Sequence, residues 1–583
     1  MIKTGKIAVI RTLAKIRRKL RSSEAAFILL GGVAGLAAGA ATIAQQLIAH
    51  GAQGLIYGVS INRLSAIGSI HHPLKLIALP IGGLALVFLA RWLARRRAPI
   101  DVVEANALHG GRIPFADSLV ISAQTLLSNG VGASVGLEAA YAQMGGGIAS
   151  LLGQWFALRR NDMRTLVGAG AGAAIGAAFG APITGAFYAF EIVIGNYTPA
   201  AIAPVMAAAL TAASVSRVLG VEPYLIATTA GRGFTIIDYL AFAGLGVICA
   251  GFGIAIMRIV TFAEQRLQGW KAIAGWRPAL GGLLLIPLAL ISPQTLSAGH
   301  GALHLDLVLR PTLSFLAILL FLKIAASVIS LSFGFRGGLF FASLFLGSLL
   351  GQLFAGLVNA SGLGFTLDPN DAALVGMAAL SVSVVGGPMT LAILMLEITH
   401  DFSLMGVVLT ATLLSSALTR ELFGYSFSTW RLHVRGSAAR SPRDIGWMHS
   451  LTAGSLMRRD WAKVPAETTV AAFRERVPLG SSKKAVITDR EGHYGGMITT
   501  AAAFHSDIKP TTQVGAIAVL RETYLAPKIG IHEMLGIFDR EGADELAVVD
   551  SERHVIGVVT EKYARRRYFE KIELSQREFF GET

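Results

Sequence analysis

Long apolar segments, many interrupted by glycine or proline, constrain this chain more than any other feature. Of its 583 residues, 53% are hydrophobic, only 15% are charged and 66 are glycine. Apolar runs of this length exceed the roughly 18 residues that indicate a membrane-spanning helix. We therefore expect an all-α polytopic membrane domain. The segments lie at about 25–50, 74–94, 115–136, 146–159, 165–195, 199–219, 236–265, 276–292, 312–333, 338–358, 371–399 and 403–422.

Two halves of the apolar region can be aligned with each other. Residues 180–192, GAPITGAFYAFEI, match residues 386–398, GGPMTLAILMLEI, without a gap. Residues 136–140 also match residues 338–342, and the offsets of 206 and 202 nearly agree. Chance similarity between segments rich in alanine and glycine is the alternative to an internal repeat. Short, interrupted segments at matching positions of two halves indicate a midplane site built by discontinuous helices.

One carboxylate, Glu138, lies in the small-residue stretch Gly132–Gly147. A charge at mid-bilayer depth costs about 2.5–3.5 kcal/mol, which favours a functional role. A glycine-rich turn that opens a helix presents free N–H groups and the positive end of the helix dipole. Such a turn attracts anions, and Glu138 is a tethered anion that could compete with a diffusing one. The alternative is a structural carboxylate that caps a helix. The aligned position of the second half is Phe340.

The net charge of +15 comes largely from arginine and lysine beside apolar runs. This arrangement follows the positive-inside rule and predicts a cytoplasmic N-terminus, whereas nucleic-acid binding would need a basic soluble domain with aromatic platforms. Cys249, the single cysteine, excludes an intramolecular disulfide and a multi-cysteine metal site. We expect no metal site, and residues 1–23 are too polar for a signal-peptide core. The basic residues that flank the first spans are Lys3, Lys6, Arg11, Lys15, Arg17, Arg18, Lys19, Arg21, Arg91, Arg95, Arg96 and Arg97.

The composition changes after the last apolar segment, and a soluble α/β part follows. This part has two units, each with a helix, a buried strand that ends in Asp, a turn and a second buried strand. The strands are expected at 484–489 and 496–499, then at 545–550 and 555–560. The expected organisation is a basic N-terminal segment 1–23, a membrane domain 24–425, a linker 426–450, soluble domains 451–508 and 509–570, and a tail 571–583.

These residues resemble the CLC family of chloride channels and chloride/proton exchangers, followed by a pair of CBS domains. The run Gly136-Leu137-Glu138-Ala139-Ala140 is similar to the family motif G-[KR]-E-G-P, in which the glutamate is the external gate. The run Gly338-Leu339-Phe340-Phe341-Ala342 is similar to G-x-F-x-P, whose amides and phenyl ring line the anion site. Tyr425 stands where the family places a hydroxyl on the central anion. The resemblance implies a homodimer of inverted-repeat subunits, each with its own pore for small anions.

The chain departs from the family pattern at several positions. Leu137 replaces the basic residue of the first motif, and Ala140 and Ala342 replace both motif-ending prolines. The family motif G-S-G-x-P is missing before residue 102, so its anion-binding serine is absent; Arg97 and Ala98 are candidates for the inner mouth. Ile192 stands where well-known exchangers carry their inner proton-relay glutamate. Glu191 and Glu397, which the repeat pairs, are interpreted as structural.

The family's CBS domains often bind adenine nucleotides through a Thr or Ser and an Asp three residues later. Here Thr499 is followed by Ala502 and Thr560 by Tyr563, so we expect neither a bound nucleotide nor another cofactor. HExxH, GxSxG in context and P-loop motifs are absent, which argues against an enzyme.

The sequence therefore predicts a dimeric, multi-pass inner-membrane protein that transports chloride under the control of Glu138, with both termini cytoplasmic. Channel-like conduction and proton-coupled exchange both stay open. A membrane sensor that no longer transports and signals through the CBS pair is the alternative from another class.

Overall fold

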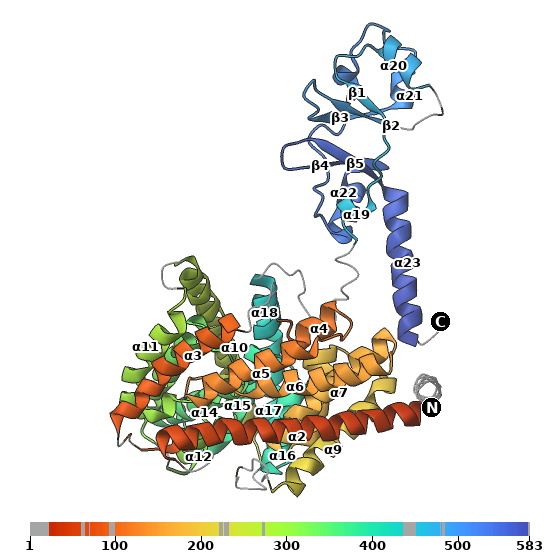
Figure 1. Ribbon diagram of the computed structural model, residues 1–583. Helices are drawn as coiled ribbons and strands as arrows, with labels where there is room; N and C mark the ends of the chain where they lie inside the picture. Colours follow the sequence, from red (N-terminus) through yellow and green to blue (C-terminus); the bar gives the residue numbers. More distant parts are fainter. Residues whose placement is uncertain are drawn as a thin grey trace, which may run out of the picture. The chain divides into compact units, whose positions relative to one another are not determined.

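The computed structural model describes residues 23–59, 64–68, 70, 72–92, 99–220, 226, 233–270, 274–309, 311–434, 451–478, 480 and 484–580. The chain divides into two compact units, Met1–Asp444 and Ile445–Thr583. The first unit is helical and the second is α/β, which confirms the predicted fold class (Figure 1). The basic segment 1–22, the inner-mouth candidates Arg97 and Ala98, and linker residues 435–450 lie outside the described residues.

The first unit consists of helices of very different lengths, several of them too short to span a bilayer. Within the described part of the chain, seven helical stretches are long and apolar enough to cross a membrane. They are Glu24–Tyr57, Pro73–Trp92, Pro199–Val218, Ile236–Gly269, Leu313–Ser332, Phe340–Ala360 and Met405–Arg431. The helices are α2 (Glu24–Tyr57), α3 (Ala78–Trp92), α4 (Val102–Leu108), α5 (Phe115–Gly130), α6 (Glu138–Trp155), α7 (Arg160–Phe179), α8 (Pro182–Tyr188), the π-helical η3 (Ala189–Ile194), α9 (Pro199–Val218), α10 (Ile236–Gly269), α11 (Arg277–Ile291), α12 (His300–Leu309), α13 (Leu313–Ser332), α14 (Phe340–Ala360), α15 (Pro369–Val385), α16 (Pro388–Thr399), α17 (Met405–Leu422) and α18 (Phe427–Val434), with short turns η1 (Leu64–Ala66), η2 (Pro73–Ile77) and η5 (Pro293–Thr295).

Local sequence accounts for many of the helix ends. Helices α8, α9, α15 and α16 each begin with proline, which has no N–H to leave unpaired in the first turn. Thr235 and Asp238 form a reciprocal capping box at the start of α10. Helix α2 ends at Gly58, whose φ of 71° is a left-handed conformation that glycine adopts without strain.

The packing of the first unit repeats itself along the chain. Helix α2 packs against α9 and α6 against α7, and in the same way α10 packs against α17 and α14 against α15. The short helices α8 and α16 occupy matching positions and contact each other. Helices of the earlier half therefore have counterparts eight labels later, in the green-to-cyan part of the ribbon (Figure 1). This arrangement confirms the internal repeat that the sequence alignment predicts.

The second unit contains two small sheets with matching hairpins. One sheet has the order β1-β2-β3 and the other has the order β4-β5. Both antiparallel hairpins, β2–β3 and β4–β5, carry a register shift near the turn. The two helix-strand-strand units predicted from the sequence are confirmed. The elements are α19 (Ala453–Leu456), β1 (Lys463–Pro465), α20 (Val470–Arg476), β2 (Lys484–Thr488), β3 (Tyr494–Thr499), α21 (Thr500–Ala503), η7 (Val514–Ile517), α22 (Ile531–Glu541), β4 (Glu545–Val549), β5 (Val555–Thr560) and α23 (Glu561–Phe580).

Candidate functional site

The two glycine loops that the sequence aligns meet directly in the fold. The Gly136 N–H donates to the Gly338 carbonyl at 3.0 Å, and the Gly338 N–H donates to the Gly136 carbonyl at 3.2 Å. Helices α6 and α14 begin two residues after these glycines, at Glu138 and Phe340. The two hydrogen bonds between the glycines therefore hold the first turns of α6 and α14, one from each half, close together. Their unsatisfied N–H groups and positive dipole ends are suited to an anion.

Two serines hold the glycine loops in place by reciprocal contacts. The Ser330 hydroxyl accepts from the Ser134 N–H at 3.0 Å, and the Ser128 hydroxyl accepts from the Arg336 N–H at 2.9 Å. Ser128 lies in α5, before the first loop, and Ser330 lies in α13, before the second loop. Each serine accepts from the loop of the other half, so the contact is the same in both directions. Reciprocity of this kind is the property of a two-fold relation.

Glu138 occupies the first position of α6 and is only 3% exposed. Its Oε2 atom is buried and accepts no hydrogen bond from the residues that the structure describes. The same oxygen lies over Gly136, where an added Cβ atom would come within 1.9 Å of it. A side chain at residue 136 would therefore displace the carboxylate. A buried carboxylate oxygen without a partner is costly, and such a group calls for a functional explanation.

The Phe340 ring lies in an aromatic group beside the same loops. Its centroid is 5.5 Å from that of Phe179 and 6.2 Å from that of Tyr188. Phe341, the next residue, stacks on His300 at 3.5 Å and on Phe179 at 6.2 Å, measured between centroids. Both rings therefore contact Phe179, and Phe341 also joins α14 to α12 through His300.

A cavity of about 150 Å³ opens beside Glu138, and we call it the Glu138 cavity. Five of the predicted site residues line it: Glu138, Ala139, Gly338, Leu339 and Phe340. The other predicted motif residues are buried and do not line it: Gly136, Leu137, Ala140, Phe341 and Ala342. Both helices thus begin at the Glu138 cavity, and their first residues, Glu138 and Phe340, line it.

Several residues that line the Glu138 cavity are not predicted as site residues from the sequence. They include Asp101, Gln143, Tyr188, Arg336 and Arg431. Arg336 donates to Gln124 at 3.1 Å, and Arg431 forms an ion pair with Glu264 at 3.1 Å. Arg336 could have been found from its place in the second aligned loop, directly before Gly337-Gly338. Arg431 carries no local motif, and Tyr188 lies in the aligned segment 180–192 at a position where the two halves differ. Only the fold brings these two residues to the cavity.

Asp101 is the N-cap residue of α4 and lies directly before residue 102, in the region where the family's G-S-G-x-P motif is missing. Its Oδ1 atom accepts from the Glu104 N–H at 2.8 Å and caps the helix. The Val102 N–H is also occupied, because it donates to Gln143 at 2.8 Å. The first turn of α4 therefore presents a carboxylate to the cavity, and two of its amides are already bonded.

Tyr425 lines a second cavity of about 350 Å³ and does not line the Glu138 cavity. Its ring stacks on His433 at 4.8 Å and lies 5.2 Å from Trp430, measured between centroids. Ile192, from the π-helical η3, borders both cavities. The residues shared by the two cavities are Val103, Ile192, Val385 and Ser428.

Glu191 and Glu397 bond to the backbone, as the sequence interpretation expects, but each bonds to the opposite repeat. Glu191 Oε2 accepts from the Thr390 N–H at 2.8 Å and from the Thr390 hydroxyl at 2.7 Å. Glu397 Oε2 accepts from the Thr184 N–H at 2.7 Å and from the Thr184 hydroxyl at 2.6 Å. Each carboxylate thus caps the start of the other repeat's short helix, α16 or α8.

Comparison with known proteins finds relatives along most of the chain. The family model described as voltage gated chloride channel matches residues 82–420. The voltage-gated ClC-type chloride channel ClcB of Escherichia coli is 28% identical over 374 residues, which is 62% of this chain and 87% of the relative. A ClcB-like protein of Ralstonia nicotianae is 30% identical over 331 residues, which is 55% of this chain and 76% of the relative.

Two solved structures share the fold at low sequence identity. A slow cyanobacterial Cl⁻/H⁺ antiporter aligns with a TM-score of 0.60 and 22% identity, covering 70% of this chain and 97% of its own. A eukaryotic CLC transporter aligns with a TM-score of 0.60 and 16% identity, covering 94% of this chain and 98% of its own. Because the first unit ends at Asp444, the second alignment extends into the α/β unit.

Proposed function

The chain belongs to the voltage-gated chloride channel family, and we propose that it carries chloride through the Glu138 cavity, with Glu138 as the gate. Members of this family are channels or transporters, so anion transport is the function of this chain. Signalling by a protein that no longer transports is not favoured.

The observation that carries the gate is the unpartnered Oε2 atom of Glu138. A buried carboxylate at the start of α6 occupies the position that the two helix dipoles make attractive to an anion. When ionised, the side chain fills that position and excludes chloride. When protonated, it loses this attraction, swings aside and leaves the position to chloride.

The backbone around Glu138 forms the rest of the anion route in this proposal. The residues are Gly136, Leu137, Ala139 and Ala140 from the first half, and Gly338, Leu339, Phe340, Phe341 and Ala342 from the second. Arg336 and Arg431, which line the cavity, raise the local concentration of anions. Tyr425 contributes at the second cavity rather than beside Glu138.

Proton coupling depends on an acid that connects the two cavities. Among the residues described as lining both, Ile192 takes the position of the family's proton relay and cannot carry a proton. Glu191 lines only the Tyr425 cavity, and its oxygens are bonded to Thr390. We therefore propose that chloride moves without fixed coupling to protons.

The proposal extends to assembly and location. Each subunit of a homodimer carries its own pore in the inner membrane, with both termini in the cytoplasm, in agreement with the basic residues around the first spans. The CBS pair supports dimer contacts and binds no nucleotide, because neither half has the expected Asp after Thr499 or Thr560.

Reversal potentials in liposomes test the proposal. Purified protein is reconstituted, and separate chloride and pH gradients are applied. We expect the reversal potential to follow the chloride gradient alone; a shift with pH would contradict uncoupled conduction. Wild-type liposomes that pass no chloride would contradict transport itself.

The gate is tested in the same liposomes with Glu138→Ala. We expect chloride flux to persist and to lose its dependence on pH, because no carboxylate remains to compete with the anion. The control is Glu421→Gln, an exposed acid at the end of α17, which should behave as wild type. A flux that keeps its pH dependence in Glu138→Ala would exclude Glu138 as the gate.

A further inference from the structure

The two hairpins of the α/β unit carry the same acidic and histidine pattern at their turns. Asp489, Glu491 and His493 follow β2, and Asp550, Glu552 and His554 follow β4, each 61 positions after its counterpart. Both turns come directly after the register shift of their hairpin. The same residue types are thus placed at the same point of two related substructures.

Each turn brings its three side chains together around the histidine ring. In the first turn, His493 Nδ1 lies 2.8 Å from Asp489 Oδ2 and 3.6 Å from Glu491 Oε2. All three ligand atoms lie within 4.8 Å of one another. The second turn is more open: His554 Nδ1 lies 3.8 Å from both Asp550 Oδ1 and Glu552 Oε2, but its three ligand atoms do not all lie within 4.8 Å of one another.

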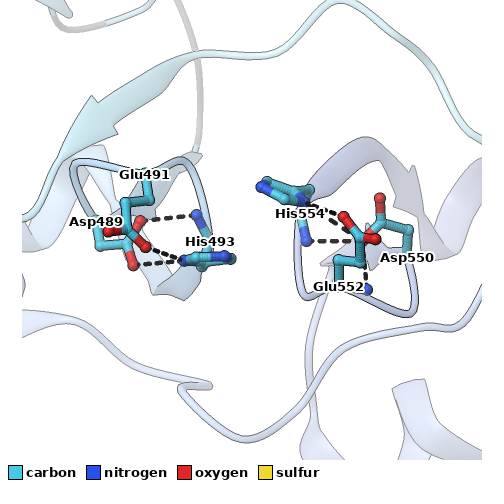
Figure 2. Close-up of polar contacts among 6 residues, drawn as sticks. All are labelled: Asp489, Glu491, His493, Asp550, Glu552 and His554. Atoms are coloured by element: carbon cyan, nitrogen blue, oxygen red, sulfur yellow. Dashed lines mark hydrogen bonds and ion pairs between the residues drawn. The ribbon is translucent and has the colours of Figure 1, made fainter.

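The two trios lie next to each other with their histidines between them (Figure 2). The imidazole centroids of His493 and His554 are 4.7 Å apart, and the two residues form an antiparallel backbone bridge. The carboxylates lie on the outer sides of the ring pair (Figure 2). Four carboxylates and two imidazoles are therefore gathered on one face of the hairpins.

Among the described residues, the nearby arginines pair with other acids and do not neutralise the carboxylates of the two trios. Arg490 pairs with Glu467 at 2.8 Å, and Arg553 lies 3.7 Å from Glu522. Lys463 approaches Gly492 but forms no ion pair with a carboxylate of either trio within the described residues.

A purely structural role accounts for part of each trio. Asp489 Oδ1 accepts from the His493 N–H at 2.8 Å, and Asp550 Oδ1 accepts from the His554 N–H at 2.8 Å. These bonds shape the turns and need only the aspartates. They do not explain why a glutamate, 80% exposed in its side chain, lies beside the histidine ring in both turns.

We propose that each turn binds one divalent transition-metal ion through the histidine Nδ1 atom and one oxygen from each carboxylate. Imidazole with carboxylate is a donor set for zinc and its neighbours, whereas magnesium and calcium prefer oxygen alone. Ligands at about 2.1 Å around a tetrahedral ion are about 3.4 Å apart. The nitrogen-to-oxygen distances of 2.8, 3.6 and 3.8 Å bracket that value. From the sequence alone we expect no metal site; the shared pattern becomes visible only when the two turns are aligned.

Zinc titration of the full chain in detergent, purified without a histidine tag, tests the proposal. We expect two equivalents of Zn²⁺ for wild type, one for His493→Ala, one for His554→Ala and none for the double variant. The matched control is His505→Ala, because His505 lies 3.5 Å from a single carboxylate, Asp507. This control should keep both equivalents, and excess Mg²⁺ should displace neither.

Glu491→Gln and Glu552→Gln separate a metal ligand from a turn-shaping residue. Both variants keep the aspartate bonds that form the turn, and each should weaken Zn²⁺ binding at its own turn at least tenfold, the lower end of what loss of an outer-shell partner costs (about 10–100-fold). No bound Zn²⁺ in wild type, or two equivalents in the double histidine variant, would overturn the proposal. A single equivalent in wild type that either histidine variant abolishes would overturn the assignment of one ion to each turn.

Discussion

The two halves of the membrane unit share their backbone contacts and differ in the side chains they direct at the Glu138 cavity. The bonds between Gly136 and Gly338 run in both directions, and Glu191 and Glu397 cap each other's helices. At the corresponding first positions of α6 and α14, however, one half has Glu138 and the other has Phe340.

This difference assigns the positioning of the site to the shared contacts and the control of the site to the side chains that differ. Symmetric contacts fix where two helix starts meet, which creates a place for an anion. In the proposed mechanism, the asymmetric side chains control that place, because only the first half supplies an acid. The symmetric contacts should therefore govern stability equally in both halves, whereas the asymmetric residues should govern transport.

The largest expected difference between the halves comes from adding one methyl group to each aligned glycine. In Gly136→Ala, the new Cβ would meet Glu138 Oε2 at 1.9 Å and force the carboxylate out of its position. In Gly338→Ala, the nearest atom, the Ala139 Cβ, is at an ordinary 3.7 Å. We expect Gly136→Ala to abolish the pH dependence of chloride flux in liposomes, and Gly338→Ala to retain it.

The glycine pair serves as its own control, since both variants add the same group at matched positions. Wild-type pH dependence in Gly136→Ala would show that the position of Glu138 beside Gly136 is unimportant. Equal losses in both variants would show that the loops respond to any added bulk and would remove the contrast between the halves.

The next effect tests the symmetric contacts. Glu191→Ala and Glu397→Ala each remove an acceptor from a threonine N–H and hydroxyl in the opposite half. Hydrogen bonds to a charged group contribute about 1.5–3 kcal/mol each, so we expect each variant to lose at least about 3 kcal/mol of stability. Thermal unfolding in detergent, followed by tryptophan fluorescence, measures this loss.

The comparison between the two glutamate variants is the informative part of that measurement, because we expect equal losses of stability. Thr390→Val and Thr184→Val, which remove only the hydroxyl, should lower the unfolding temperature by smaller and matching amounts. A large loss for one glutamate with little effect of the other would mean that the caps have diverged in role.

The membrane fold could be predicted well because short sequence motifs at matching positions reveal its internal repeat. Pro182 and Pro388 start matched short helices, and the alignments at residues 136 and 338 identified loops that bond directly. The same alignment identified Glu138 and Phe340. These residues are found from sequence because a helix start depends on its neighbours along the chain.

The cavity wall could not be predicted in the same way. Tyr188 and Arg431 reach the Glu138 cavity through the packing of helices far apart in sequence, and no spacing rule indicates it. Tyr425, placed by resemblance alone, lines the neighbouring cavity. The trios around His493 and His554 were within reach of sequence analysis, because they become visible once the two hairpins are aligned.

The smallest expected effect concerns Asp101, a further asymmetry between the halves. This carboxylate caps the start of α4, whereas its counterpart α12 starts at His300 after Gly299. Like charges about 8 Å apart at an effective dielectric constant of about 20 repel by about 2 kcal/mol. Asp101→Ser removes the charge and keeps a good N-cap, so we expect chloride to bind about 30-fold more tightly. Calorimetric titration with chloride in detergent measures the change, and Asp101→Asn, another capping residue without charge, should match it. If both variants bind chloride as wild type does, Asp101 does not act on the anion, and the asymmetry of the site reduces to Glu138 and Phe340.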